Sequence, residues 1–105
     1  MEKKENTELS HPLDFLIELQ KILKERQENP APDSYTNKLL TQGYDKVLQK
    51  VGEEAVEYIL EAKNESKYMI TEGADLVYHF LLSLTAKGLS LTDIVNELEK
   101  RHKNK

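Results

Sequence analysis

The chain has 105 residues and a formal net charge of −4, and its acidic and basic residues are mixed along the sequence. This length and composition indicate one soluble domain and argue against a nucleic-acid-binding face, which needs clustered basic residues. The absence of cysteine excludes disulfides and thiolate sites. The sequence shows neither a secretory signal nor an apolar run of the roughly 18 residues that a membrane span needs, so we expect a cytoplasmic protein that does not enter a membrane.

The sequence opens with a polar segment and a first helix. Residues 1–11 are polar, and we expect them to be a disordered tail, so that residues 12–105 form the single domain. Pro12 can occupy the first turn of a helix, and the following residues, LDFLIELQKILKERQE, place apolar side chains at helical spacing. The segment NPAPDS (residues 29–34) ends this helix, because two prolines in three residues cannot continue it.

The middle of the chain predicts two further helices. Ser34 can cap a short helix over YTNKLLTQ, which ends at Gly43. From Tyr44 to about Ala62 the apolar residues again follow the helical period. The segment KNES (residues 63–66) then indicates a short turn.

Two helices are predicted after this turn, over residues 67–86 and 91–103. Gly88 is placed to end the first of them. Ser90 and Asp93 have the spacing of a capping box for the second, and the cationic residues at its end suit the helix dipole. No useful alternating strand pattern occurs, so the expected fold class is all-α, with four or five helices forming a bundle.

The helix over residues 67–86 is apolar around most of its circumference, at ~100° per residue. Such a helix must be buried on several sides, and the few helices of one short chain cover it poorly. We therefore expect a second copy of the chain to complete the bundle, as a homodimer or larger assembly. Gly73 costs this helix roughly 1 kcal/mol relative to alanine, unless it permits the close approach of another helix.

Acidic residues gather on the two helices that flank the KNES turn. Glu53, Glu54 and Glu57 share barely more than one turn of the first helix. Glu72 and Asp75 lie on the narrow polar strip of the apolar helix that follows. Because a short turn makes these helices an antiparallel hairpin, Glu54 and Glu57 can face Glu72 and Asp75.

Four carboxylates in one half-buried place repel one another. Two unit charges ~4 Å apart repel by about 1 kcal/mol in water and roughly 4 kcal/mol at an effective dielectric constant of 20. Protons or a cation must relieve this repulsion, and carboxylate oxygens favour Mg²⁺ or Mn²⁺. Phosphate oxygens of a substrate could fill the positions that Mg²⁺ keeps open. An E-E-x-x-E run alone is more often a solvated helix face, so both interpretations stay open at this point.

The order of these acidic residues resembles the signature of the all-α nucleoside-triphosphate pyrophosphatases, the MazG-like superfamily. Within it, five segments are similar to the phosphoribosyl-ATP pyrophosphohydrolase family. They are SYTNKL (residues 34–39), KVGEEAVE (50–57), ADLVYH (74–79), GLSL (88–91) and ELEKRH (97–102). The resemblance covers roughly residues 34–102.

This resemblance implies hydrolysis of phosphoribosyl-ATP to phosphoribosyl-AMP and pyrophosphate, the second step of histidine biosynthesis. It implies that Glu54, Glu57, Glu72 and Asp75 are the principal Mg²⁺ ligands, with Mn²⁺ as an alternative metal, and that Glu53 is a ligand or a partner of the ligands. In the expected mechanism a water activated by the metal attacks in line, with Glu53 as a candidate proton acceptor. Many relatives are fused to a cyclohydrolase domain, for which this chain has no room, so we expect that activity on a separate chain.

Three cationic residues are candidates for contacts to the substrate's phosphates. Lys50 is the first candidate, although one turn before Glu54 it can equally serve as an i,i+4 ion-pair partner. Lys38 and Arg101 lie in segments that match the family, but lysine and arginine are common on any surface.

His79, one turn after Asp75, is a further candidate for substrate binding. A satisfied core histidine, or one that supports the metal ligands, is the commoner arrangement. We interpret Tyr35 and Tyr78 as packing residues.

Two other functions fit the same residues. One is a house-cleaning pyrophosphatase of the same superfamily that acts on non-standard nucleotides, which a panel of nucleotide substrates would distinguish. The other is a non-catalytic helical dimerisation module with a solvated acidic face. A module of that kind would show no Mg²⁺-dependent rise in melting temperature.

Overall fold

Five helices make up the protein in a computed structural model that describes residues 10–104, and no strand occurs within those residues. The helices are α1 (Asp14–Glu28), α2 (Tyr35–Gln42), α3 (Tyr44–Lys63), α4 (Met69–Thr85) and α5 (Leu91–Lys103). The all-α prediction is confirmed, and every predicted helix agrees to within two residues at either end. Residues 1–9 of the expected tail lie outside the described residues, whereas Ser10 and His11 hydrogen-bond to the Asp14 carboxylate at the start of α1.

The junction between α2 and α3 depends on a cap and a glycine. The Ser34 hydroxyl accepts a hydrogen bond from the backbone N–H of Asn37 at 3.3 Å, which satisfies one of the free donors at the start of α2. Gly43 lies between the two helices with φ at +107°, a conformation that side chains disfavour. The chain can therefore change direction between α2 and α3 within a single residue.

The end of α4 is closed by the hydrogen-bond pattern of a Schellman motif. The backbone N–H of Leu89 donates to the Leu84 carbonyl at 2.9 Å, and that of Gly88 donates to the Thr85 carbonyl at 3.0 Å. Gly88 has φ at +73°, as this motif favours. The prediction that Gly88 ends the helix is confirmed.

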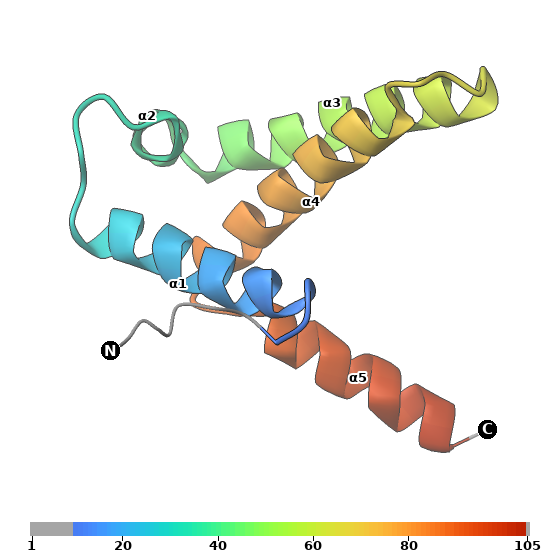
Figure 1. Ribbon diagram of the computed structural model, residues 1–105. Helices are drawn as coiled ribbons and strands as arrows, with labels where there is room; N and C mark the ends of the chain where they lie inside the picture. Colours follow the sequence, from blue (N-terminus) through green and yellow to red (C-terminus); the bar gives the residue numbers. More distant parts are fainter. Residues whose placement is uncertain (1–9, 105) are drawn as a thin grey trace.

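Helices α3 and α4 run side by side in opposite directions and form a long hairpin (Figure 1). Helix α1 packs against the C-terminal part of α4, α2 connects α1 to α3, and α5 extends away from the hairpin. The buried core lies where α1, α2 and the start of α3 meet the end of α4. Its members are Leu23, Leu39, Val47, Leu81, Leu82 and Leu84. The core therefore anchors one end of the hairpin and leaves the other end projecting.

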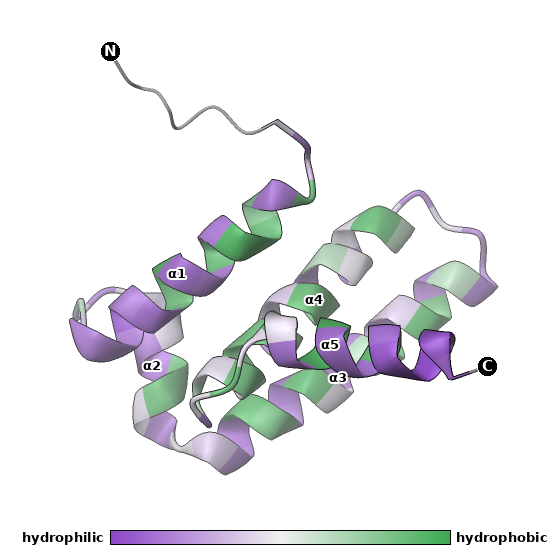
Figure 2. Cartoon of the chain, turned by 90° about the horizontal axis from the view of Figure 1, so that it is seen from below, coloured by the Kyte–Doolittle hydropathy of each residue, from purple (hydrophilic) through white to green (hydrophobic). Residues whose placement is uncertain are grey.

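The projecting end of the hairpin carries apolar side chains on its surface, and Figure 2 shows apolar residues along these helices. On α4, Ile70 is 81% exposed and Val77 is 42% exposed, and on α3 Ile59 is 59% exposed. In the single chain, the prediction that α4 is buried on several sides thus holds only for the C-terminal half of the helix. Within residues 10–104, no helix has the length and apolar character that crossing a membrane requires.

Candidate active site

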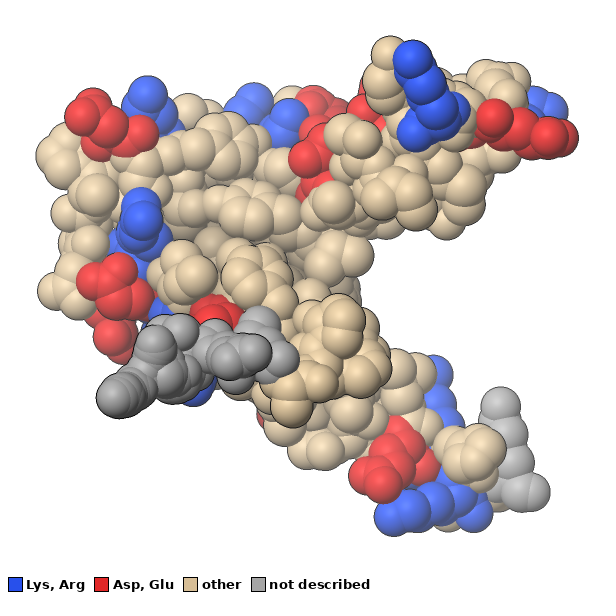
Figure 3. All heavy atoms as spheres, viewed as in Figure 1, with Lys and Arg blue, Asp and Glu red and all other residues tan. Residues whose placement is uncertain are grey.

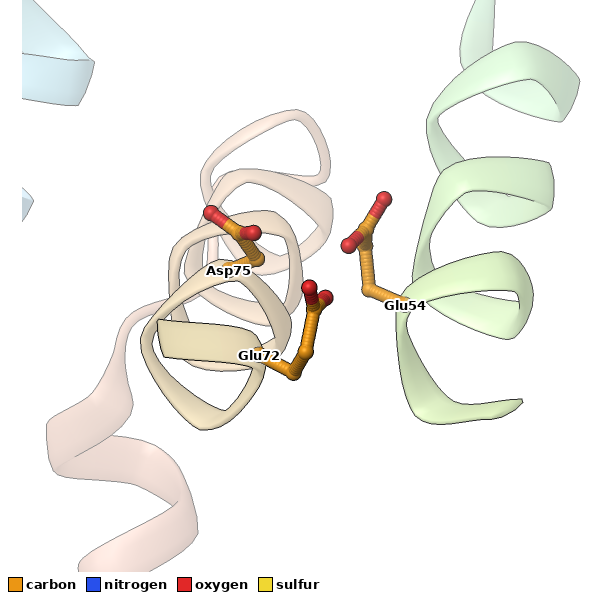
Figure 4. A group of neighbouring side chains, drawn as sticks. All are labelled: Glu54, Glu72 and Asp75. Atoms are coloured by element: carbon orange, nitrogen blue, oxygen red, sulfur yellow. The ribbon is translucent and has the colours of Figure 1, made fainter. Parts of the chain in front are cut away.

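The α3–α4 hairpin brings three carboxylates together, one from α3 and two from α4. Oxygen atoms of Glu54, Glu72 and Asp75 all lie within 4.8 Å of one another. Figure 4 shows the Glu54 side chain extending from α3 toward the other two carboxylates. Glu72 and Asp75 are three residues apart and therefore share one face of α4. The predicted convergence of acidic residues across the hairpin occurs in the structure.

The cluster is electrostatically strained in the absence of a cation. Burial raises the pKa of Glu72 above its ordinary value, and the charges of Asp75, Glu54, Glu57 and Glu61 raise it further. Each neighbouring carboxylate therefore disfavours ionisation of Glu72. A bound cation would reverse this effect.

Lys50 is the cation nearest to the cluster among the described ion pairs. Its ammonium lies 3.3 Å from a Glu54 carboxylate oxygen and 3.4 Å from a Glu53 oxygen. The hydrogen bond to Glu54 raises the pKa of Lys50, and Glu53 contributes in the same direction. The i,i+4 ion pair considered for Lys50 is present, and its ammonium lies at the edge of the carboxylate cluster, where a phosphate group could reach it.

Glu53 lies outside the three-carboxylate cluster. It is exposed, and its carboxylate accepts a hydrogen bond from the Gln49 side chain at 2.7 Å. This bond, followed by the pairing with Lys50, lowers the pKa of Glu53. A carboxylate with a lowered pKa takes up a proton less readily, so the proton-acceptor role stays a prediction that the local chemistry does not favour.

The other predicted site residues lie at varying distances from the cluster. Glu57 is exposed on α3 and is not one of the three converging carboxylates, although its charge acts on Glu72. Lys38 is exposed on α2. Arg101 lies on α5 and pairs with Glu97 at 3.0 Å, at the far end of the chain from the hairpin, where Figure 3 shows other basic residues. One chain therefore does not bring Arg101 to the carboxylates.

His79 is buried, with 5% of its surface exposed. Its Nδ1 lies 2.7 Å from the backbone carbonyl of Asp75, and its Nε2 lies 2.8 Å from the Tyr35 hydroxyl. Both ring nitrogens are thus occupied by protein partners, as expected of a histidine that supports neighbouring residues. The hydroxyl group that contacts His79 belongs to Tyr35, which the sequence led us to interpret as a packing residue. The signal for this role was the position of Tyr35 inside the family-like segment SYTNKL.

The three carboxylates fit a hard divalent cation. Ligand oxygens on opposite sides of Mg²⁺ are about 4 Å apart, so oxygens within 4.8 Å of one another need only small side-chain rotations to bind one ion. The set contains oxygen donors alone, which suits Mg²⁺ or Mn²⁺ better than softer metals. Three negative charges also require more positive charge than Lys50 alone supplies.

Comparison with known proteins assigns the chain to a family. The sequence profile of the family described as phosphoribosyl-ATP pyrophosphohydrolase matches residues 16–102. The phosphoribosyl-ATP pyrophosphatase of Leptospira biflexa is 46% identical over 91 residues, which are 86% of this chain and 99% of that protein. The histidine biosynthesis bifunctional protein HisIE of Caldanaerobacter subterraneus is 46% identical over 92 residues, which are 87% of this chain and 45% of that protein. The chain thus spans less than half of this bifunctional relative and nearly all of the monofunctional one.

Proposed function

The chain belongs to the phosphoribosyl-ATP pyrophosphohydrolase family, and we propose that it hydrolyses phosphoribosyl-ATP to phosphoribosyl-AMP and pyrophosphate with the help of Mg²⁺. This reaction is a step of histidine biosynthesis. The observation that carries the proposal is the convergence of Glu54, Glu72 and Asp75 across the α3–α4 hairpin. The three carboxylates repel one another, and a cation bound between them would relieve that repulsion.

Glu54, Glu72 and Asp75 hold the metal, and Glu57 supplies a fourth carboxylate. Glu57 lies one turn after Glu54 on the same helix, and its exposed side chain is free to rotate toward Glu72. When bound, Mg²⁺ orients the phosphates, neutralises developing charge and lowers the pKa of a coordinated water. Mn²⁺ has the same ligand preference and is expected to substitute for it.

Lys50 has two tasks in this site. In the chain alone its ammonium offsets part of the charge of Glu54. Once a cation shares that charge, the same ammonium is available to the phosphate oxygens of the substrate, for which lysine is a common ligand. Lys38 and Arg101 stay predictions as phosphate contacts.

A second copy of the chain completes the helical bundle. A largely apolar hollow of about 490 Å³ lies on the hairpin, lined by Tyr58, Met69, Ile70, Gly73, Leu76 and Val77, of which Met69, Ile70 and Val77 are exposed. Figure 3 shows a wide opening between the tip of the hairpin and α5, into which another protein surface can enter. Neighbouring exposed apolar side chains can mark an association surface. Ile70→Glu should therefore shift the protein toward the monomer in light-scattering measurements, whereas a native protein that is already monomeric would contradict the dimer.

The deciding experiment is an assay of pyrophosphate release with and without Mg²⁺. The purified chain is expected to act on phosphoribosyl-ATP in preference to standard and non-standard nucleoside triphosphates. Glu54→Gln should abolish turnover while the circular dichroism spectrum stays helical. A preference for non-standard nucleotides would favour the house-cleaning function. Inactivity on all substrates, together with a melting temperature that does not change at millimolar Mg²⁺, would favour the non-catalytic module.

A further inference from the structure

Two adjacent residues at the start of α2 fasten this helix to α4 by side-chain hydrogen bonds. The Tyr35 hydroxyl lies 2.8 Å from His79 Nε2, and the Thr36 hydroxyl is hydrogen-bonded to the Tyr78 hydroxyl. The ring of Tyr35 meets the His79 ring edge-on, with centroids 5.7 Å apart. The two contacts differ in one respect, because the His79 side chain also hydrogen-bonds to the backbone of Asp75, one of the three carboxylate residues.

When His79 is neutral, its hydrogen bonds determine the direction of the Tyr35 hydrogen bond. A backbone carbonyl only accepts, so the 2.7 Å contact from Nδ1 to the Asp75 carbonyl requires a proton on Nδ1. Neutral His79 then has an unprotonated Nε2, which accepts the single proton of the Tyr35 hydroxyl. The Tyr35 oxygen is left with lone pairs and no proton to donate elsewhere.

Tyr35 is also electrostatically coupled to the carboxylate site. Burial raises the pKa of its phenol, Lys50 opposes this, and the charges of Glu54 and Asp75 add to it. The residue as a whole is 48% exposed. Part of Tyr35 is therefore accessible to a ligand.

We propose that Tyr35 is a ligand-binding residue at the edge of the carboxylate site, where its oxygen accepts a hydrogen bond from an O–H group of the bound ligand, and that His79 is the positioning residue that orients it. An ionised phosphate oxygen cannot be that partner, since it carries no proton and can only accept a hydrogen bond. An O–H donor could come from two sources: a ribose hydroxyl of the nucleotide, or a water in the hydration shell of the metal. His79 acts only through Tyr35. This inference rests on the proposed function.

Tyr35→Phe is the test, and Tyr78→Phe is its matched control. Each substitution removes one phenolic hydroxyl that joins α2 to α4, so both carry a comparable cost in stability. Three quantities are measured for each variant. The first is the pair kcat and KM for phosphoribosyl-ATP at saturating Mg²⁺. The second is the dissociation constant of phosphoribosyl-AMP, measured by calorimetry. The third is the Mg²⁺ midpoint, which is the Mg²⁺ concentration that gives half of the metal-induced rise in melting temperature without nucleotide.

The outcomes separate the two sources of the O–H group. If a ribose hydroxyl is the donor, Tyr35→Phe raises KM and weakens binding of phosphoribosyl-AMP by about 3- to 10-fold, the effect of one neutral hydrogen bond, and leaves the Mg²⁺ midpoint unchanged. If a hydration water is the donor, the Mg²⁺ midpoint rises by a similar factor. Either result supports the inference, provided that Tyr78→Phe changes none of the three quantities. Equal effects of the two substitutions, or no effect of Tyr35→Phe, would overturn it.

A double substitution tests the role given to His79. Glutamine is the chosen replacement for His79 because its amide oxygen can still accept a hydrogen bond from Tyr35. If His79 acts only through Tyr35, adding His79→Gln to Tyr35→Phe should change neither KM nor the Mg²⁺ midpoint further. Additive losses would show that His79 acts independently of Tyr35. An inactive parent chain would overturn the proposed function and this inference with it, whereas an active parent with an unaltered Tyr35→Phe variant would overturn the inference alone.

Discussion

Replacing Asp75 by asparagine is expected to stabilise the protein when no divalent cation is present and to remove its response to Mg²⁺. The side chain keeps its shape but loses its charge, and the hydrogen bond from His79 is unaffected because it ends on the Asp75 backbone carbonyl. The repulsion between Asp75 and Glu54 disappears. The same substitution at a surface aspartate outside such a cluster would neither stabilise the protein nor change its response to Mg²⁺.

The size of the effect follows from the geometry of the cluster. At a separation of 4.8 Å, two unit charges repel by about 0.9 kcal/mol at the dielectric constant of water and about 3.5 kcal/mol at an effective value of 20. The Glu54 side chain is only 13% exposed, so the true value lies between these limits. A gain of about 1 kcal/mol corresponds to a rise in melting temperature of about 4–8 °C for a domain near this size.

Thermal melts in a chelator and in a Mg²⁺ series measure both parts of this prediction. The parent should gain about 1.4 kcal/mol of stability when free Mg²⁺ reaches ten times its dissociation constant, whereas Asp75→Asn should gain little. Asp33→Asn, an exposed aspartate in the loop between α1 and α2, is the matched control. If Asp75→Asn melts below the parent in the chelator and still responds to Mg²⁺ like the parent, the reasoning about the cluster is refuted.

Three further substitutions test separate parts of the structure. Glu57→Gln should raise the Mg²⁺ midpoint of the thermal shift by less than Glu54→Gln does, because Glu57 reaches the cation only by rotating from an exposed position; an unchanged midpoint would remove it from the ligand set. Partial burial and neighbouring carboxylates raise the pKa of Glu72, so its contribution to stability is fully present below its ordinary pKa of 4.5 and is lost as pH rises through the folded-state value. Thermal melts in a chelator at a series of pH values should show this loss of stability in the parent and not in Glu72→Gln. Identical dependence of melting temperature on pH in the two proteins would contradict the prediction. Gly73→Ala should stabilise the protein by about 1 kcal/mol in urea unfolding, because the added Cβ would lie 3.5 Å from the Tyr58 ring, an ordinary contact; destabilisation would mean that the glycine serves a closer helix approach in the assembly.

The local architecture could be predicted because its causes are local. Apolar periodicity located every helix, and the chain turns where Ser34, Gly43 and Gly88 predict it. A short connection between two helices leaves them antiparallel neighbours, so the presence of acidic residues on both sides of the hairpin was also predictable. The absence of cysteine already excluded a thiolate metal site.

Rotation of each helix about its axis was not predictable in the same way. Glu54 and Glu57 are one turn apart, and periodicity alone treats them as equal candidates to face α4. Packing of α3 on α4 turned Glu54 inward and left Glu57 exposed. The i,i+4 ion pair of Lys50 with Glu54, by contrast, lies within α3 and was predictable from spacing.

The sequence by itself determined that this is an all-helical member of its family with a carboxylate-bearing hairpin, because helix periods, caps and short turns act over a few residues. Tertiary structure alone decided which carboxylates meet and which hydroxyl contacts His79. Tyr35 and His79 are 44 residues apart in the chain, and no local pattern specifies a hydrogen bond over that distance. It forms because the core at Leu81 and Leu82 fixes where α2 lies on α4, and that packing depends on many side chains at once.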